Sequence, residues 1–264
     1  MNIRIALLCA GTFFTANTLL GWSPSEWWDT LMGRYHEDVE SHKYPFTDPH
    51  QVIIEGHIGN IQVKTWHHDA LMVEVVKKGT EEHINDTRVM ASVQNGVARF
   101  TTHTPAHAEP IPVDYTVIIP VETGILSVKA TQGDIMVKNI AGSLTAITES
   151  GSIDIRESIA TITAQAQGSI SVSQRDLAPS QSLFLKARDM ITLALPPQCN
   201  AHLSARTLGG LINSSLYITF DPITTKLSRE TWKRLKRFIQ GTIGAGGAPI
   251  TLETQTGTID IREL

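Results

Sequence analysis

The chain has 264 residues, of which 41% are hydrophobic, 6% aromatic and 18% charged, with 19 glycines and a mean hydropathy of -0.04. This balance excludes an intrinsically disordered polymer, a protein with many membrane spans and a small disulfide-rich scaffold. The formal net charge of -4 is too small to indicate a nucleic-acid partner.

The first residues have the pattern of a secretory leader. Arg4 precedes an apolar run from Ile5 to Phe14, as in the charged and apolar regions of a signal peptide. No clean small-x-small cleavage site comes after it, and the run is short for a bilayer span, which needs about 20 apolar residues. We therefore expect residues 1–21 to be a signal peptide or a membrane anchor and residues 22–49 to be a linker. Removal of the leader with Cys9 would leave Cys199 without an intramolecular disulfide partner.

The next part of the chain predicts strands that do not repeat. Residues 52–76 contain two alternating apolar runs, and residues 80–104 resemble a hairpin with Asn95-Gly96 as its turn. Such strands suit an N-terminal β cap, because a stack of strands needs its terminal edge covered.

A repeat organises most of the chain after residue 125. Residues 126–137, 144–155, 203–214 and 250–261 each place an aliphatic residue seven positions before a glycine and an Ile two positions after it. Residues 162–172 form a module one residue shorter, and residues 183–193 have Asp189 in place of the glycine. Within each module apolar and polar residues alternate on both sides of the glycine, which predicts two short strands joined by a bend.

Two such strands cannot bury their apolar faces alone, so stacked modules are expected to share a core. The fold class predicted is all-β, as a parallel β-solenoid resembling a β-helix. An antiparallel sandwich is the alternative, but Asn95-Gly96 is the one Asn-Gly or Asp-Gly pair in the chain. The side chains predicted to point inward are Leu126, Val128, Ile135, Val137, Leu144, Ala146, Ile153, Ile155, Ile170, Val172, Ile191 and Leu193.

Residues 227–240 are predicted to form one short amphipathic helix near the C-terminus, with Ser228 as its N-cap. Its apolar residues suit packing on the solenoid, while its basic residues suit contact with an anionic surface, and both interpretations stay open. Six of the 22 Lys and Arg residues lie in positions 226–237, against a single acidic residue, Glu230. These candidate contact residues are Lys226, Arg229, Lys233, Arg234, Lys236 and Arg237.

Several ordered segments together resemble the bacterial DUF4097 family, whose members are known as putative adhesins. They are Gly59-Asn-Ile-Gln-Val-Lys-Thr-Trp66, residues 113–120, the successive Gly-x-Ile-x-Val modules, and residues 195–201, 241–250 and 254–261. The resemblance covers residues 50–264. It implies an exported or membrane-anchored β-solenoid of the cell envelope, and it carries over no catalytic residue. Asp189 departs from the family's glycine and predicts a different bend.

The residue types suited to chemistry do not form a recognisable set. Asp134, Asp154 and Asp260 are expected to point outward, as carboxylates do in β-helix enzymes that process acidic polysaccharides, but no three fall in register. His103 and His107 have the spacing of metal ligands on a helix, yet Pro105 indicates a loop. We therefore predict no catalytic residue, no metal and no cofactor.

The function expected is that of a non-catalytic exported protein of the periplasm, cell envelope or extracellular space. It would be an adhesin or interaction scaffold whose partner is an envelope or host surface polymer, lipid or protein, and not a nucleic acid. Two alternatives stay open. One is a β-helix enzyme that processes polysaccharides, and the other is an envelope-sensing module attached to the membrane through its N-terminus.

Overall fold

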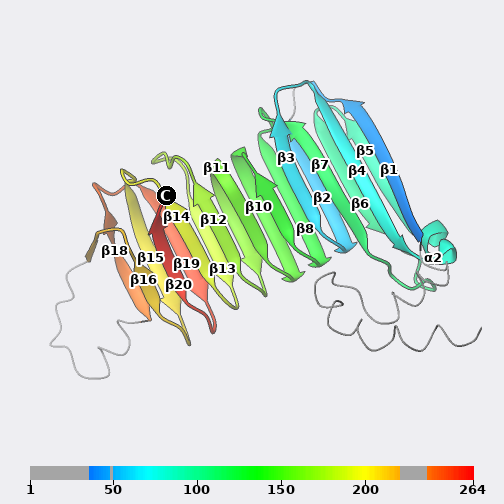
Figure 1. Ribbon diagram of the computed structural model, residues 1–264. Coiled ribbons are helices and arrows are strands. Elements are labelled where there is room, and N and C mark those ends of the chain that lie inside the picture. The colour runs from blue at the N-terminus through cyan, green and yellow to red at the C-terminus, as the bar shows by residue number, and fades with distance from the viewer. Residues whose placement is uncertain (1–35, 48–49, 221–236) are drawn as a thin grey trace, which may run out of the picture.

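The computed structural model describes residues 36–47, 50–220 and 237–264. These residues form an elongated all-β structure in which the strands follow one another in a row (Figure 1). The described part contains one short helix, α2 (Glu81–Asp86), for which the Thr80 hydroxyl accepts a hydrogen bond from the His83 backbone N–H. Within the same part, no helix has the length and apolar character needed to cross a membrane.

The strands before residue 140 are β1 (His36–Pro45), β2 (Gln51–Ile58), β3 (Ile61–Trp66), β4 (Ala70–Gly79), β5 (Arg88–Gln94), β6 (Val97–His103), β7 (Val113–Pro120), β8 (Ile125–Gln132) and β9 (Ile135–Lys138). Those after it are β10 (Ala141–Ser150), β11 (Ile153–Ala166), β12 (Ile170–Gln174), β13 (Leu183–Ala187), β14 (Ile191–Leu195), β15 (Ala201–Thr207), β16 (Ile212–Ser214), β17 (Ile218–Phe220), β18 (Phe238–Ile243), β19 (Ala248–Thr254) and β20 (Ile259–Glu263).

Two sets of paired strands run along the row. The first sheet has the order β1, β4, β7, β3, β9, β11, β12, β14, β20, β16. The second sheet has the order β5, β6, β2, β8, β10, β11, β13, β19, β15, β18, β17. Strand β11 belongs to both, because its register shifts between Ile155 and Ser158 and the strand passes from one sheet to the other.

The strand orientation is mixed. Every pairing from β7 to β16 in the first sheet, and from β6 to β15 in the second, is parallel. At the two ends the pairings of β1 and β4, and those of β5, β17 and β18, are antiparallel. The all-β prediction is therefore confirmed, whereas a wholly parallel arrangement describes the middle of the row and not its ends.

The predicted inward set forms the core between the two sheets. All twelve residues are buried, and none of them is more than 1% exposed. They are joined in register from strand to strand, for example Ile135 with Ile153 and Ile153 with Ile170. We call each pair of strands joined at a corner, one from each sheet, a rung, and the row of rungs the array. Each rung therefore adds another layer of aliphatic side chains to a continuous core.

The glycines of the modules stack at the corner where the second sheet turns into the first. A Cβ atom on Gly133 would lie 2.0 Å from the carbonyl oxygen of Gly59, and one on Gly151 would lie 2.1 Å from that of Gly133. Both glycines also have positive φ, 134° and 152° respectively. Glycine recurs here because the backbones of successive corners touch directly. At Asp189, where the sequence lacks the glycine, φ is not positive, but the same holds for Gly168, Gly210 and Gly257, so the different bend stays a prediction.

The order of the rungs differs from the order of the modules in the chain. The C-terminal unit, β19 with β20, lies between the β13–β14 rung and the β15–β16 rung (Figure 1). Likewise β2 and β3 lie inside the array, between β6–β7 and β8–β9. The prediction that residues 52–66 belong to a cap was therefore wrong, because Gly59 provides the same corner as the later glycines.

The structure also bears on three predictions for segments at the ends of the row, namely a hairpin, a linker and a helix. The hairpin is confirmed, since β5 and β6 pair across Asn95 and Gly96, which have φ values of 51° and 71°. The linker is not linker throughout, because its residues 36–45 form β1 on the edge of β4. The helix over residues 227–240 lies mostly outside the described residues. Its last three residues are strand, because β18 pairs antiparallel with the edge strand β15.

Candidate functional site

The outward carboxylates singled out by the sequence have structural partners. Asp134 follows the corner glycine, and its Oδ1 accepts a hydrogen bond from the Ser152 backbone N–H at 2.7 Å. The Asp134 N–H in turn donates to Oδ1 of Asn60 at 2.9 Å. The same contact recurs on either side, from Asn60 N–H to Asp114 Oδ1 and from Ser169 N–H to Ser152 Oγ. We call these residues the corner ladder, and its side chains join the turns of successive rungs.

The other two carboxylates belong to ion pairs within their own strands. Arg156 Nε donates to Asp154 Oδ2 at 2.7 Å, and Arg262 Nε donates to Asp260 Oδ2 at 2.6 Å. The Asp154 carboxylate raises the pKa of Arg156 by this hydrogen bond and by its charge. Within the described ranges, no three His, Cys, Asp or Glu side chains form a group that could hold a metal ion.

The basic segment predicted to contact an anionic surface falls mainly outside the described residues. Lys226, Arg229, Lys233, Arg234 and Lys236 lie in the range 221–236. Arg237 is described, and its carbonyl oxygen accepts a hydrogen bond from the Thr207 backbone N–H at 2.8 Å. Because only Arg237 of the six is described, the structure does not test whether these side chains lie together.

A groove lies on the outer surface of the second sheet. It has a volume of about 480 Å³ and crosses β10, β11, β13 and β19 close to the corner. Its floor includes Thr148, Ala166 and Ala187, whose side chains are small and buried. We call it the second-sheet groove. Its polar lining residues are Glu149, Gln165, Gln167, Lys186, Arg188 and Gln255.

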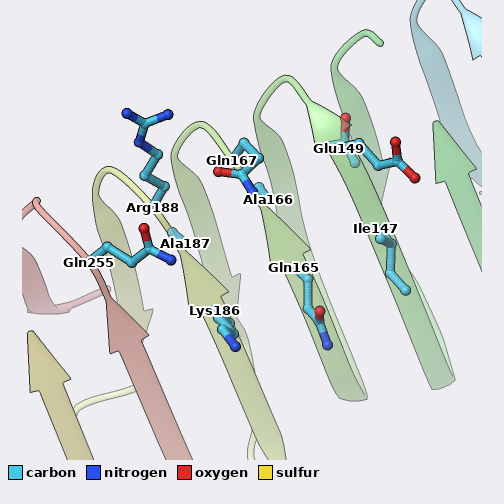
Figure 2. Close-up of a pocket in the computed structure, with 10 residues that line it drawn as sticks. Ile147, Glu149, Gln165, Ala166, Gln167, Lys186, Ala187, Arg188 and Gln255 are labelled. Carbon is cyan, nitrogen blue, oxygen red and sulfur yellow. The ribbon is translucent and has the colours of Figure 1, made fainter. Parts of the chain in front are cut away.

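The parallel strands pair without an offset, so the polar side chains that line the groove form two rows across the strands. Gln165 lies opposite Lys186, and Lys186 lies opposite Glu253. The pairing continues past the strand ends, since the Arg188 N–H donates to the Ala166 carbonyl and the Gln255 N–H to the Ala187 carbonyl. Figure 2 shows Glu149, Gln167, Arg188 and Gln255 near the turns and Gln165 and Lys186 lower on the strands.

The groove continues toward β15. An adjoining hollow of about 220 Å³ shares Lys186 and Gln255 with it and adds Arg206, Leu208 and Glu253. Arg206 lies opposite Glu253 on β19, two strand spacings from Lys186. A linear molecule lying across the strands would therefore meet both hollows in succession.

The cations that form ion pairs in the described part of the chain lie outside the groove. Ion pairs there involve Lys77, Lys78, Arg99, Lys138, Arg156 and Arg262. Among the described residues none involves Lys186, Arg188 or Arg206, and all three side chains are exposed. Two carboxylates share the two hollows with these cations, because Glu149 lines the groove and Glu253 lies opposite both Lys186 and Arg206. Three cations against two carboxylates leave the combined lining with a net positive charge, which favours an external anion.

Sequence reasoning missed this groove. Lys186 and Arg188 were visible as an outward pair on either side of Ala187, but the amides beside them come from other modules. The available signal was the alternation within residues 183–193, which places both cations on the same side of the chain. Their neighbours on β19 could not be found in the same way, because β19 is displaced from its place in the module order.

The fold resembles solved structures of bacterial proteins, although no protein-family model and no curated protein matches the chain. A putative cell adhesion protein from Clostridium sporogenes is 8% identical, with a TM-score of 0.50, over 88% of this chain and 100% of that one. A putative adhesin from Bacteroides fragilis is 12% identical, with a TM-score of 0.35, over 86% and 97% of the two chains. A putative lipid binding protein from Parabacteroides distasonis is 10% identical, with a TM-score of 0.29, over the same shares. At this identity the first likeness shows a shared fold alone.

Proposed function

We propose that the chain is a non-catalytic adhesin or interaction scaffold of the bacterial cell envelope, built as a parallel β-solenoid of the DUF4097 type. The observation that carries this proposal is the in-register stacking of the rungs, which aligns outward polar side chains in rows across consecutive strands. On the second sheet one such row joins Thr145 to Thr163 and a neighbouring row joins Gln165 to Lys186. A repeating polar surface suits contact with a repeating partner such as a surface polymer.

The core supports the scaffold role. Buried polar side chains between the rungs are mostly bonded to the protein itself, as where Gln174 Nε2 donates to the Ala160 carbonyl at 2.8 Å and the Ser158 hydroxyl bonds to Gln174 Oε1. Such internal bonding stabilises the stack and leaves the outer faces to make contacts. The resemblance in fold to the Clostridium sporogenes protein is in keeping with this role.

Export is part of the proposal, with residues 1–21 as signal peptide or anchor and residues 50–264 as the envelope domain. N-terminal sequencing of the protein recovered from the producing cell tests it. A new N-terminus near residue 21 supports a released envelope protein. An intact Met1 in the membrane fraction supports the alternative of a membrane-anchored sensing module, and an intact Met1 in the cytoplasm contradicts export.

One assay distinguishes a protein that only binds polysaccharide from an enzyme that cleaves it. The purified protein is incubated with isolated envelope polysaccharide and host glycans, and both retained protein and newly formed sugar ends are measured. We expect retention without release of reducing or unsaturated ends. Release of such ends would instead support the polysaccharide-processing enzyme, and neither retention nor release would refute both interpretations.

A further inference from the structure

We propose that the second-sheet groove binds an acidic polysaccharide, with Lys186 and Arg188 holding a sugar carboxylate and the neighbouring glutamine amides bonding to hydroxyls. This inference rests on the proposed function, which it makes specific by naming the site and the class of ligand. The charge, the geometry and the lining of the groove each support it.

The charge of the groove favours a carboxylate. Lys186 and Arg188 flank the buried Ala187 and both point outward, so their Cα atoms are about 7 Å apart on one face of the chain. A planar guanidinium and an ammonium at this separation can share one carboxylate, the guanidinium through paired N–H groups and the ammonium as a point charge. Neither cation forms an ion pair with any described residue, although Glu253 lies opposite Lys186 on β19, so an incoming carboxylate meets two cations and one acidic neighbour.

The amides around this pair favour a sugar. Gln165 and Gln167 lie on the β11 side of the cations, and Gln255 lies on the β19 side. Each amide offers two N–H donors and a carbonyl acceptor, which is the combination that a hydroxyl group needs because it both donates and accepts. Of these three side chains only Gln165 is half-buried, and within the described ranges none of them forms a side-chain hydrogen bond.

The direction of the groove favours a polymer over a single small anion. Arg206 lies two strand spacings beyond Lys186 along the axis of the array, which is about 10 Å. The adjoining hollow makes this path continuous, since it shares Lys186 and Gln255 with the groove. A chain lying across the strands would place one acidic unit at Lys186 and Arg188 and a later one at Arg206, with an uncharged part of the chain passing Glu253 between them.

The lining argues against a lipid surface as the ligand. Apart from the buried floor, Ile147 is the one aliphatic residue lining the groove among those described, and the adjoining hollow adds only Leu208. A membrane contact would instead require apolar side chains that reach the acyl region beside the basic ones. Anionic vesicles therefore serve as the competing ligand in the test.

The experiment measures binding of a short oligomer of galacturonic acid to the full chain by calorimetry, with a neutral galactose oligomer as the matched ligand. The variant Lys186→Gln/Arg188→Gln removes the carboxylate contacts. The variant Lys64→Gln/Lys138→Gln removes the same charge from the outer face of the first sheet. We expect the first variant to weaken binding at least about tenfold, equivalent to about 1.4 kcal/mol, and the second to leave the Kd unchanged. Thermal melting of each variant checks that it is folded.

Four outcomes would overturn the inference. They are no binding of the oligomer by the unaltered chain, equal binding of the neutral oligomer, equal weakening in both variants, and binding to phosphatidylglycerol vesicles that the oligomer does not displace. If the chain is retained on envelope polysaccharide but the Lys186→Gln/Arg188→Gln variant is retained equally, the groove assignment fails while the proposed function stands. Loss of affinity with added salt is expected in addition, since the contacts are ionic.

Discussion

At the scale of single residues, the corner glycines are fixed by contact between backbones as well as by conformation. In Gly151→Ala the new methyl group would lie 2.1 Å from the Gly133 carbonyl oxygen, at a residue whose φ is 152°. The clash is with backbone atoms, so no side chain can move aside to relieve it, and the positive φ remains strained. We therefore expect the free energy of unfolding to fall by about 3 kcal/mol. Urea denaturation measures this loss.

Gly124→Ala is the matched control. Its Cβ would meet only the His50 carbonyl oxygen, at 3.3 Å, and its φ is not positive. A distinctly smaller loss is expected there. Equal losses in the two variants would mean that the corner glycine has no special role.

Asp134 offers a second test at this scale, because the corner ladder gives it a structural role. Asp134→Ala removes the acceptor of the Ser152 N–H and should lower the free energy of unfolding by about 1 kcal/mol. Asp134→Asn keeps an acceptor oxygen and should restore most of the loss. If the asparagine variant were as unstable as the alanine variant, the negative charge and not the hydrogen bond would be what matters.

At the scale of elements, ion pairs of the buried Lys77 side chain of β4 hold β1 against β4. The Lys77 side chain is 8% exposed, its Nζ bonds to Glu40 Oε1, and Asp38 Oδ2 lies 3.7 Å away. The hydrogen bond from Lys77 lowers the pKa of Glu40 below its ordinary value of 4.5, against the opposing effect of burial. The folded state therefore binds a proton less readily than the unfolded state, so this contribution to stability is present above pH 4.5 and is lost as the pH falls through the lowered pKa.

Replacement of the carboxylate tests this fastening. Glu40→Gln should destabilise the protein by about 1–2 kcal/mol at neutral pH, allowing for the partial exposure of Glu40. It should also flatten the decline of the melting temperature below pH 4.5. Lys77→Met is the counterpart, because it leaves two partly exposed carboxylates that water can solvate, and it should be the milder change. A Glu40→Gln variant with an unchanged acid decline would contradict the argument.

The elements also show how far the sequence predicts this fold. Alternation around each glycine identified the strands and the inward side chains, because burial of one face imposes a period of two residues. The partner of each strand could not be predicted, since every module presents similar aliphatic columns. Leu185, for example, pairs with Ala164 on one side and with Leu252 on the other. The second-sheet groove was missed for the same reason, because Lys186 of β13, Arg188 just after it and Gln255 after β19 are brought together only by that pairing.

At the scale of the whole molecule, the interior position of β19 and β20 predicts an unusual response to truncation. Removal of residues 246–264 would leave one side of β13, β14, β15 and β16 without its strand partner. Hydrogen exchange should then show loss of amide protection throughout residues 183–220, while residues 125–150 keep theirs. In an array stacked in chain order, the same truncation would expose only the last rung.

Removal of residues 263 and 264 alone is the control. It takes away the bonds from the Glu263 N–H to Ser215 Oγ and from the Leu264 N–H to the Leu195 carbonyl. Protection in residues 183–207 should survive this change. If it does not, the sensitivity lies in the C-terminal residues themselves and not in the missing rung.

The interior position of β19 and β20 also affects the order in which the parts of the molecule can fold. During synthesis the residues of β13 and β15 emerge before those of β19, so neither strand can acquire its final neighbour until residues 248–254 are available. The part near β8 to β12 can assemble earlier, since its partners lie close together in the chain. Pairings between distant segments form slowly, because a long loop must close first. The groove would therefore be completed late, because its β13 and β19 side waits for residues 248–254 while its β10 and β11 side can form earlier.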